Sequence, residues 1–518
     1  MFKLIVLSLG IVLIQGLVPE PKYSKLSSKY QTINLKDIQL NENSTQCFTV
    51  MSAFDRLVDR MRKRSWLRLK PQNEVFVEHQ KKEIMHVSVT ILKGCNELGK
   101  YSMPNSKMDE SYSMTISNKM VNIVASELWG VLRSFQTLIQ LVKKSKKGAL
   151  VIKTGTIIDE PRFMHRGFLI DTSRHFLSLA KIKSFVDAME IVKMNVLHWH
   201  IIDDPSFPYK VYTFPDLWKL GSFDPIEAVY SQEDISEVIE YARARGIRVM
   251  IEIDTPGHTE SWTGLNDIQS PCFNEKGEIF KYGPLNPTLN ETYDSLNKLF
   301  KEVYGKFPDD FIHLGGDEVN PSCWKSNKDI VAFMKEKNIP TFEALEGFYI
   351  KKLIQILDAL KEKKTRIFWE EVYYNKDLSD KSSVVHIWIE PKNYPIQAAE
   401  ITKDGFQVLV SSPWYLNKIS YGNDMEQYYD FDPRNFNGSS VQKGLILGGE
   451  ACIWGEYIND FNLMPVSWPR GSAVAERLWS DESMKDFNKF NDRAGELACF
   501  MQNMGLQVGA MEPGYCHN

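Results

Sequence analysis

The sequence predicts an α/β protein in which a (β/α)8 barrel follows a small α+β domain. Two observations favour this fold class. Beyond residue 159, eight short apolar stretches alternate with segments whose apolar residues recur at helical spacing. Polar and aromatic residues then cluster where these stretches end. The main alternative is a doubly wound open sheet, but no Gly-x-Gly-x-x-Gly follows the first stretch.

The bulk properties exclude several classes of partner. The chain has 518 residues, of which 43% are apolar and 25% charged, and its net charge is -4. This composition is ordinary for globular proteins. So small a net charge gives no reason to expect binding to nucleic acid or to a membrane surface.

The amino terminus, residues 1–16, reads as a secretory signal peptide. Lys3 provides its positive start, and residues 4–14 are apolar but too few to cross a bilayer. No later segment is apolar enough to span a membrane. We therefore expect a soluble protein of the secretory pathway, either lysosomal or secreted.

That compartment decides how the seven cysteines are interpreted. Disulfides are favoured over metal ligands in an oxidising lumen, and no Cys-x-x-Cys pair is present. Because seven is odd, at least one cysteine should be unpaired or bond to another chain. Asn-x-Ser/Thr sequons at Asn43, Asn290 and Asn437 predict a glycosylated surface.

Residues 17–158 should form the small α+β domain. Apolar and polar residues alternate over residues 74–78 and 85–91, as in half-buried strands. Helical spacing follows over residues 127–138. No obvious cluster of candidate catalytic residues lies in this part of the chain.

The barrel should occupy residues 159–518. Its strands are expected at residues 166–170, 196–202, 249–253, 311–314, 366–369, 384–388, 407–410 and 445–447. Near-continuous apolar runs suit parallel strands, which are buried on both faces. Before the third strand, Ser231 and Asp234 form a capping box and Gly246 a stop signal for a helix.

The most informative motif follows the fourth strand: His313-Leu-Gly-Gly-Asp317-Glu318. Two glycines let the chain turn sharply and let a ligand approach closely. Neighbouring carboxyl groups can be driven to different pKa values, so that one donates a proton while the other stays charged. For Asp-Glu alone, a solvated loop or a helix N-cap is the plain alternative.

Polar and aromatic residues follow the other strands as well. In chain order they are residues 171–175, 198–200, 203–204, 254–258, 369–371, 388, 414–415 and 454–456. A single such aromatic would be core or rim. Several at one end of a barrel, with carboxylates and an arginine, suit a sugar, whose C–H faces stack on indole rings and whose hydroxyls need polar partners.

A metal centre is the competing interpretation. His198-x-His200, with Asp254, His258 and His313, has the composition of a catalytic metal site on a barrel. The nearby tryptophans and acids suit a sugar better than a metal-bound water, so we expect no metal and no organic cofactor. Loss of activity in EDTA that zinc restores would favour the metal.

Five segments resemble glycoside hydrolase family 20, the β-N-acetylhexosaminidases. They are residues 165–175, 198–204, 254–258, 313–318 and 449–456, and together they cover the expected barrel from end to end. The amino-terminal part is similar, more loosely, to the non-catalytic α+β domain of that family.

The resemblance implies an exo-acting, retaining enzyme that removes terminal N-acetylglucosamine or N-acetylgalactosamine. In this family the substrate's own acetamido oxygen attacks the anomeric carbon and forms an oxazolinium intermediate. The sequence leaves Glu370 or Glu371 open as a conventional nucleophile. A non-enzymatic sugar-binding relative is disfavoured because Asp317 and Glu318 are both present.

The resemblance also implies a role for each matching position. Glu318 would protonate the leaving oxygen, while Asp317 and Tyr415 would orient the acetamido group. Trp369, Trp388 and Trp454 would form an aromatic box, and Arg174 and Glu456 would bind the sugar hydroxyls. Asp203 and His258 would lie between substrate and acid. His200, Asp254 and His313 would support the network around the acid.

Cysteine spacing resembles that of the lysosomal members of the family. It implies the pairs Cys47–Cys95, Cys272–Cys323 and Cys499–Cys516 and leaves Cys452 free. The second pair would tie the loops after the third and fourth strands together near the two acids.

Asn417-Lys418 stands where lysosomal members differ in accepting negatively charged substrates. Lys418 keeps a positive charge there, which predicts some tolerance of 6-sulfated N-acetylglucosamine. A solvated surface lysine is the alternative. Members of the family often dimerise through the catalytic side of the barrel, so a homodimer is expected.

Overall fold

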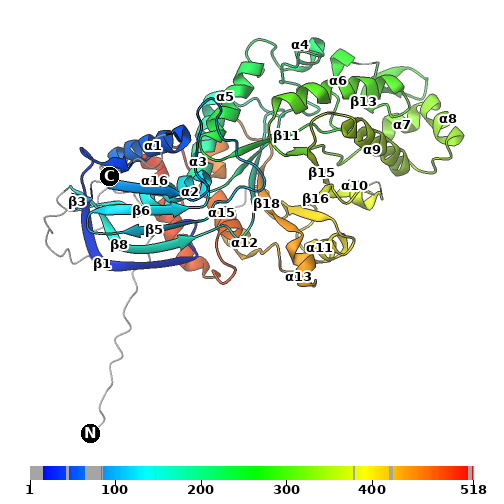
Figure 1. The fold of residues 1–518 in the computed structure, drawn as a ribbon. Helices are drawn as coiled ribbons and strands as arrows, with labels where there is room; N and C mark the ends of the chain where they lie inside the picture. Colours follow the sequence, from blue (N-terminus) through cyan, green and yellow to red (C-terminus); the bar gives the residue numbers. More distant parts are fainter. Residues whose placement is uncertain are drawn as a thin grey trace, which may run out of the picture.

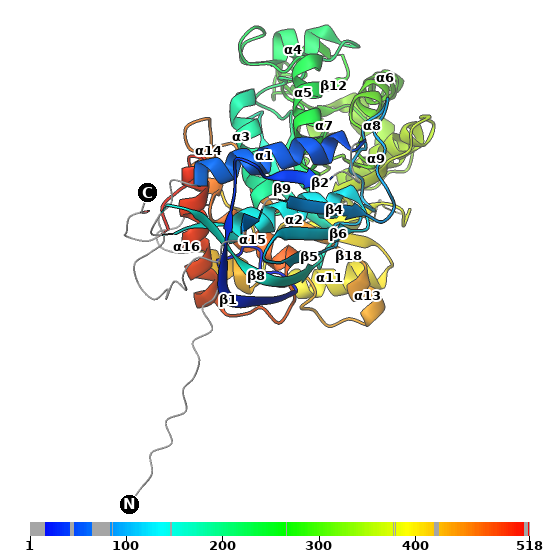
Figure 2. The same ribbon diagram turned by 60° about the vertical axis from the view of Figure 1, so that its left-hand side comes forward.

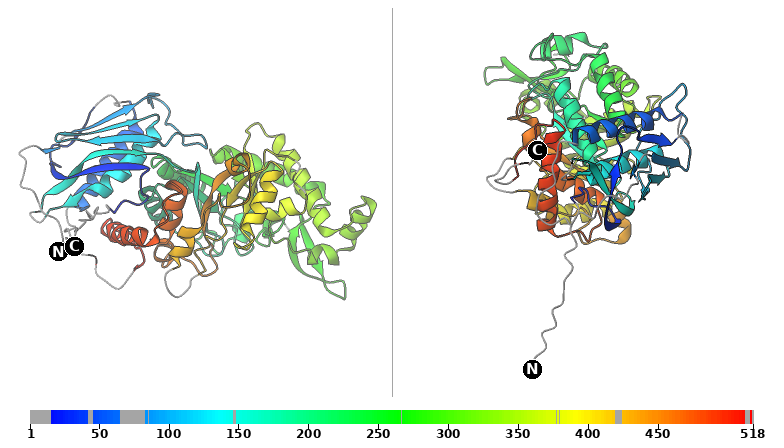
Figure 3. Two further views of the ribbon diagram at one scale, coloured as in Figure 1. Left: turned by 90° about the horizontal axis from the view of Figure 1, so that it is seen from below. Right: turned by 90° about the vertical axis from the view of Figure 1, so that its left-hand side faces the viewer.

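The computed structural model describes residues 16–41, 46–64, 83–84, 86–145, 148–265, 267–376, 378, 380–418, 424–511 and 516. Within these residues a closed barrel is joined to a separate sheet, and the two lie side by side along the molecule (Figure 1, Figure 3). The predicted fold class is confirmed.

Eight parallel strands close the barrel, and each corresponds to one of the apolar stretches. They are β9 (His165–Asp171), β10 (Val196–His200), β11 (Arg248–Glu252), β14 (Phe311–His313), β15 (Thr365–Trp369), β16 (Val384–Ile387), β17 (Gln407–Val410) and β18 (Ile446–Ile453). Their carboxyl ends meet at one face, which is where the predicted polar and aromatic residues follow.

Helices surround this barrel. The main ones are α3 (Leu179–Ile191), α5 (Gln232–Arg243), α6 (Asn290–Lys306), α9 (Phe342–Asp358), α11 (Tyr394–Lys403) and α15 (Gly471–Trp479). The predicted capping box of Ser231 and Asp234 is present at the start of α5. Gly246 has a φ of +68° after the end of that helix, as its role as a stop signal requires.

Shorter elements fill the connections. They are α4 (Pro215–Gly221), η1 (Thr263–Leu265), the hairpin of β12 (Gln269–Phe273) and β13 (Ile279–Leu285), α7 (Ser322–Ser326), α8 (Lys328–Glu336), α10 (Glu370–Tyr374), α12 (Met425–Asp430), α13 (Ser440–Gly444) and α14 (Leu463–Ser467). The disulfide Cys272–Cys323 joins β12 to α7 and so ties the connection after β11 to the one after β14.

The barrel interior changes from apolar to polar along its axis. Val196, Met250, Ile367, Val384 and Leu409 come from five different strands and form a buried cluster of their own. Further towards the carboxyl ends, the inward positions carry histidines, Glu252 and Glu450 instead. Branched apolar residues are the usual filling of such a barrel, so the polar layer needs a separate explanation.

The amino-terminal part contains an eight-stranded sheet. Its strands are β1 (Tyr23–Ile33), β2 (Gln39–Asn41), β3 (Glu83–Ile84), β4 (His86–Ile91), β5 (Tyr112–Ile116), β6 (Met120–Ala125), β7 (Lys143–Lys144) and β8 (Leu150–Asp159). Helix α2 (Leu128–Leu141) packs on the sheet, and α1 (Phe48–Arg64) packs beside α2 (Figure 2). The predicted strand at residues 85–91 and the helix at 127–138 are β4 and α2, whereas residues 74–78 lie outside the described residues.

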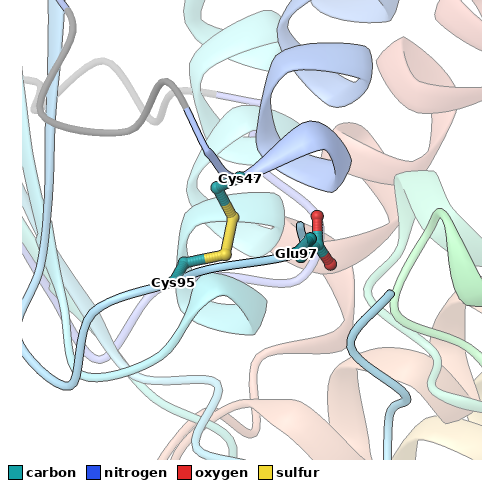
Figure 4. Close-up of side chains that lie close together, drawn as sticks. All are labelled: Cys47, Cys95 and Glu97. Atoms are coloured by element: carbon teal, nitrogen blue, oxygen red, sulfur yellow. A yellow bond between two sulfur atoms is a disulfide. The ribbon is translucent and has the colours of Figure 1, made fainter. Parts of the chain in front are cut away.

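Figure 4 shows the disulfide Cys47–Cys95, which joins the start of α1 to the segment after β4. Glu97 lies beside it and accepts hydrogen bonds from Thr49 N–H at 2.7 Å and from the Thr49 hydroxyl at 2.8 Å. A carboxylate at this end of a helix satisfies a free N–H group and opposes the helix dipole.

The chain ends in α16 (Phe487–Asn503), which contacts α1 and α12 and so touches both parts of the molecule. The disulfide Cys499–Cys516 links this helix to the residues that follow it. Among the described residues, no helix has the length and apolar character needed to cross a membrane.

Candidate active site

The turn after β14 presents two acids at the carboxyl end of the barrel. Backbone φ is +65° at Gly315 and +91° at Gly316, values that favour glycine. A Cβ at Gly315 would lie 1.7 Å from Oδ1 of Asp254, the residue two positions beyond β11. Gly316 N–H donates to the same oxygen at 2.9 Å. Asp254 therefore fixes the shape of this turn.

Asp317 and Glu318 lie in different surroundings. Asp317 is buried, whereas Glu318 is exposed and has a φ of +50°, a strained conformation for a residue with a side chain. Burial, together with the charge of Asp317, raises the pKa of Asp254 well above its usual range. Asp254 is thus held as the neutral acid beside Asp317.

His258 lies among three acids. Its Nε2 is 3.8 Å from Asp317 Oδ2 and 3.9 Å from Asp254 Oδ2, and its Nδ1 is 3.1 Å from Asp203 Oδ1. Burial lowers the pKa of His258, but these acids outweigh burial and raise the pKa well above its usual value. The imidazole therefore contacts Asp203 at hydrogen-bond distance and lies close to the other two acids.

Asp203 connects that imidazole to the other side of the pocket. Its Oδ2 lies 2.7 Å from His200 Nε2 and 2.8 Å from Arg174 Nη2. Arg174 also donates to Asp171 Oδ2 at 3.0 Å, and its guanidinium carbon lies 5.2 Å from the centre of the Trp454 ring. Burial lowers the pKa of Arg174, but nearby carboxylates, Asp171 first among them, raise it above its usual value. The guanidinium is fixed and charged beside an aromatic wall.

Four aromatic residues form a closed box. Going round it, the ring centres are 6.5 Å apart for Trp369 and Trp388, 6.1 Å for Trp388 and Tyr415, 6.4 Å for Tyr415 and Trp454, and 6.1 Å for Trp454 and Trp369. The four residues stand at or just beyond the ends of β15, β16, β17 and β18. The structure thus brings the three tryptophans of the predicted box together, and Tyr415 closes it on the fourth side.

Two further acids support this box. Glu371 accepts the indole N–H of Trp388 at 3.0 Å, and burial, with the charge of Asp317, raises the pKa of Glu371 to about 8. Glu370 accepts backbone N–H groups of Trp388 and Ile389 at 3.2 and 2.7 Å, and burial raises the pKa of Glu370 to about 7. Burial is thus the main cause that raises the pKa of both carboxyl groups.

The remaining predicted residues lie at the rim. Glu456 is exposed, and its charge acts on Arg174. Lys418 is exposed, with its Nζ 5.1 Å from the centre of the Tyr415 ring. Asn417 is half-buried, and within the described residues its Oδ1 accepts no hydrogen bond.

Sequence analysis missed Glu252 and Glu450, two fully buried carboxylates beneath the pocket. Between them lies His198, with Nδ1 2.6 Å from Glu450 Oε2 and Nε2 3.0 Å from Glu252 Oε2. Burial lowers the pKa of His198, but the two carboxylates raise it to about 9. His198 thus hydrogen-bonds Glu450 and lies close to Glu252, so it connects the two carboxylates across the barrel. A charged residue inside a fully buried strand is the signal that could have found both.

The disulfides implied by the resemblance are all present in the structure. They are Cys47–Cys95, Cys272–Cys323 and Cys499–Cys516, and Cys452 is buried and free. Two of the three sequon asparagines, Asn290 and Asn437, are exposed. Asn43 lies outside the described residues.

A pair of acids, an aromatic box and a fixed arginine at the carboxyl end of a barrel define a sugar-cleaving enzyme, a glycoside hydrolase. The family model described as "Glycosyl hydrolase family 20, catalytic domain" matches residues 163–482, and the model "beta-acetyl hexosaminidase like" matches residues 17–141. The chain therefore belongs to glycosyl hydrolase family 20, and it is an exo-acting β-N-acetylhexosaminidase.

Relatives of known name agree with this family. The chain is 45% identical to the human β-hexosaminidase subunit beta over 83% of its own length and 76% of that protein. It is 40% identical to the bovine subunit alpha over 97% of its length and 95% of that protein. Among solved structures, a chitobiase from Flavobacterium johnsoniae matches with a TM-score of 0.81 and 28% identity, over 95% of this chain and 73% of that one.

Proposed function

We propose that this enzyme cleaves terminal β-linked N-acetylhexosamine with retention of configuration, using the substrate's own acetamido oxygen as the nucleophile. The observation that carries the proposal is the buried Asp317 beside the exposed Glu318, next to a closed aromatic box. A box of this kind suits the methyl group of an acetamide. An internal nucleophile also has a very high effective concentration.

Three residues would act on the reacting atoms. Glu318 protonates the leaving oxygen, and because it is exposed it can recover its proton from solvent. Asp317 accepts from the acetamido N–H and stabilises the positive charge that develops on the ring being formed. Tyr415 donates to the acetamido oxygen, and burial raises the pKa of its hydroxyl well above the usual value, which keeps it a donor.

Arg174, Asp203 and Glu456 would bind the sugar hydroxyls. The guanidinium is held by ion pairs with Asp171 and Asp203, so it can approach a hydroxyl without first being ordered. Glu456 lies close enough for its charge to act on Arg174. A charged donor and carboxylate acceptors together suit the paired hydroxyls of a hexose.

The sequence leaves Glu370 or Glu371 open as an alternative nucleophile, and Glu371 is the one whose pKa the charge of Asp317 also raises. A conventional retaining enzyme needs an ionised carboxylate about 5 Å from its acid. Burial raises the pKa of Glu371 to about 8, and its Oε2 already accepts from Trp388. Both facts favour a supporting role for Glu371 and substrate assistance in the reaction.

A matched pair of aryl glycosides tests the mechanism. One carries a 2-acetamido group and the other a 2-hydroxyl, with the same leaving group. We expect the acetamide to be hydrolysed at least about 1,000-fold faster, because only it contains the internal nucleophile. A thiazoline analogue of the cyclised intermediate should also bind more tightly than the product. Efficient turnover of the 2-hydroxyl substrate would refute substrate assistance.

Lys418 would contribute to substrate choice. Its ammonium group is exposed above the Tyr415 ring, at the rim of the proposed sugar site. We expect Lys418→Leu to lower the turnover of a 6-sulfated N-acetylglucosaminide about 3- to 10-fold relative to the unsulfated substrate, since a partly exposed ion pair contributes about 1 kcal/mol. An unchanged ratio would show that Lys418 is only a solvated surface residue.

We also propose that the protein travels the secretory pathway, to the lysosome or out of the cell, as a glycosylated homodimer. The three disulfides and the exposed sequon residues Asn290 and Asn437 support the oxidising route. Residues 1–16 would be its cleaved signal, residues 17–158 its non-catalytic domain and residues 159–518 its catalytic barrel. Sedimentation of the mature protein, before and after glycosidase treatment, tests both the dimer and the glycans.

A further inference from the structure

Glu252 is the last residue of β11, and its side chain is fully buried beneath the pocket. In the register of the barrel it lies between His200 on β10 and His313 on β14. Isolated, a carboxylate in such a place would be very unfavourable. The groups that donate hydrogen bonds to Glu252 therefore explain how this carboxylate can be buried beneath the pocket.

Two side chains, His200 and Trp369, donate hydrogen bonds to Glu252, and two further imidazoles lie close to its oxygens. Oε2 lies 2.7 Å from His200 Nδ1 and 3.0 Å from His198 Nε2. Oε1 accepts the indole N–H of Trp369 at 2.9 Å and lies 3.2 Å from His313 Nδ1. Burial raises the pKa of Glu252, but the histidines outweigh it and lower the pKa well below the usual value. The carboxylate is ionised and has little freedom to move.

The two donors lead to different groups of pocket residues. Trp369 is one wall of the aromatic box, and its indole N–H points at Glu252. His200 uses its other nitrogen to bind Asp203, and Asp203 in turn holds Arg174. The orientations of the aromatic wall and of the sugar-binding arginine thus depend on the same carboxylate.

We propose that Glu252 is a positioning residue that sets the distance between the aromatic box and the Asp203–Arg174 pair, and so shapes the pocket for the cyclised intermediate. It touches no substrate, because the wall and the histidine lie between it and the pocket. This proposal rests on the proposed function in one respect, which is that the ligand used to probe the pocket is a mimic of the cyclised intermediate.

Glu450 offers a matched control. It too is fully buried, and it lies 2.6 Å from His198 Nδ1 and also contacts His165 Nε2. Neither contact is a hydrogen bond to the aromatic box or to Asp203, although the His198 ring stacks on Trp369 with the ring centres 6.3 Å apart. A substitution there removes the same kind of buried carboxylate from the same polar layer, without cutting a direct link to the pocket.

The test compares Glu252→Gln with Glu450→Gln in the full-length enzyme. Inhibition constants are measured for the thiazoline analogue and for the product, N-acetylglucosamine, because these constants depend on the folded enzyme and not on how much of it folds. For Glu252→Gln we expect the thiazoline constant to rise about 10- to 100-fold and the product constant by less. For Glu450→Gln we expect both to stay within about twofold of wild type while the melting temperature falls. Equal effects of the two substitutions, or no effect of the first, would overturn the proposal.

A second measurement applies if Glu252→Gln does not fold. His200→Gln and Trp369→Phe each cut one link to Glu252 but keep the positions of the two side chains, each of which also contacts Trp454. If Glu252 couples them, the double variant should change the inhibition constant of N-acetylglucosamine by a factor that differs more than threefold from the two single factors multiplied together. Multiplicative effects would reject the coupling. If the thiazoline does not bind wild-type enzyme more tightly than the product, the result counts against the proposed mechanism instead. The inhibition constants of N-acetylglucosamine would still test the role of Glu252.

Discussion

Among single residues, Glu318 combines exposure with backbone strain. A φ of +50° costs on the order of 1–3 kcal/mol for a residue with a side chain and persists only where neighbours enforce it. Asp317 on one side is buried, and Val319 on the other packs against the apolar cluster around Trp324. The chain is anchored on both sides, which can enforce the strained conformation of the exposed Glu318.

Glu318→Gln should therefore remove proton donation with little change in shape. For an aryl glycoside with a poor leaving group we expect kcat to fall about 100- to 10,000-fold, because general acid catalysis contributes that much. A dinitrophenyl glycoside, whose leaving group needs no proton, serves as the matched control and should lose far less. Equal losses on both substrates would mean that Glu318 acts in some other way.

Residue identity explains which parts of the site could be predicted. The sequence indicated Asp317, Glu318, Arg174 and the tryptophans because they stand at or after the ends of predicted strands, where polar and aromatic residues cluster. Glu252 ends a run of buried strand residues, and periodicity assigns it to the strand. Its charge inside a buried strand is a local signal, but its role depends on hydrogen bonds from His200 and Trp369 on other strands, and no local pattern contains those partners.

At the scale of elements, the turn after β14 depends on the absence of a side chain at Gly315. A methyl group there would overlap Asp254 Oδ1, and the φ of +65° would be unfavourable as well. Because Asp254 also contacts Gly316, any shift that relieves the overlap must move the segment that carries Asp317.

We expect Gly315→Ala to lower kcat/KM at least about 100-fold, since misplacement by about 1 Å can cost that much. Gly305→Ala is the control. Gly305 lies within α6 with nothing within 4 Å of an added Cβ, so alanine there should leave activity unchanged and raise stability by up to about 1 kcal/mol. Thermal unfolding and steady-state kinetics of both variants provide the comparison. Wild-type activity of Gly315→Ala would mean that the turn tolerates a side chain.

Whole elements were predicted unevenly, for a physical reason. The barrel strands are buried on both faces, and their continuous apolar runs stand out from the helices between them. The β12–β13 hairpin gave no such signal, because Pro271 and Pro284 interrupt its strands and much of β13 is exposed. The disulfide to α7, which the family resemblance implied, is what ties this hairpin to the active-site side of the barrel.

At the scale of the whole molecule, one buried acid joins the two parts. Glu110, in the amino-terminal part, accepts from Arg133 Nε at 2.7 Å and from Arg166 Nη2 at 2.6 Å, and it also accepts from Asn195 at 3.0 Å. Arg133 belongs to α2, whereas Arg166 and Asn195 belong to the barrel. Arg133 also donates to the carbonyl of Gly246. Burial raises the pKa of Glu110, but the two guanidinium groups lower it below the usual value, so the acid is charged.

Glu110→Gln should consequently destabilise both parts without changing the pocket. Two buried guanidinium groups would lose their counter-charge, which we expect to cost about 3–5 kcal/mol. Arg166 stands near the amino end of β9, at the opposite end of the barrel from the acids, so the inhibition constant of the product should stay within about twofold of wild type. Glu160→Gln is the control, because it removes the exposed ion pair with Lys22, and such pairs contribute at most about 1 kcal/mol. Calorimetry of the three proteins should show a large fall in melting temperature for Glu110→Gln alone. A fall confined to one of two separate transitions would mean that the amino-terminal sheet and the barrel unfold independently, and that this acid is not what couples them.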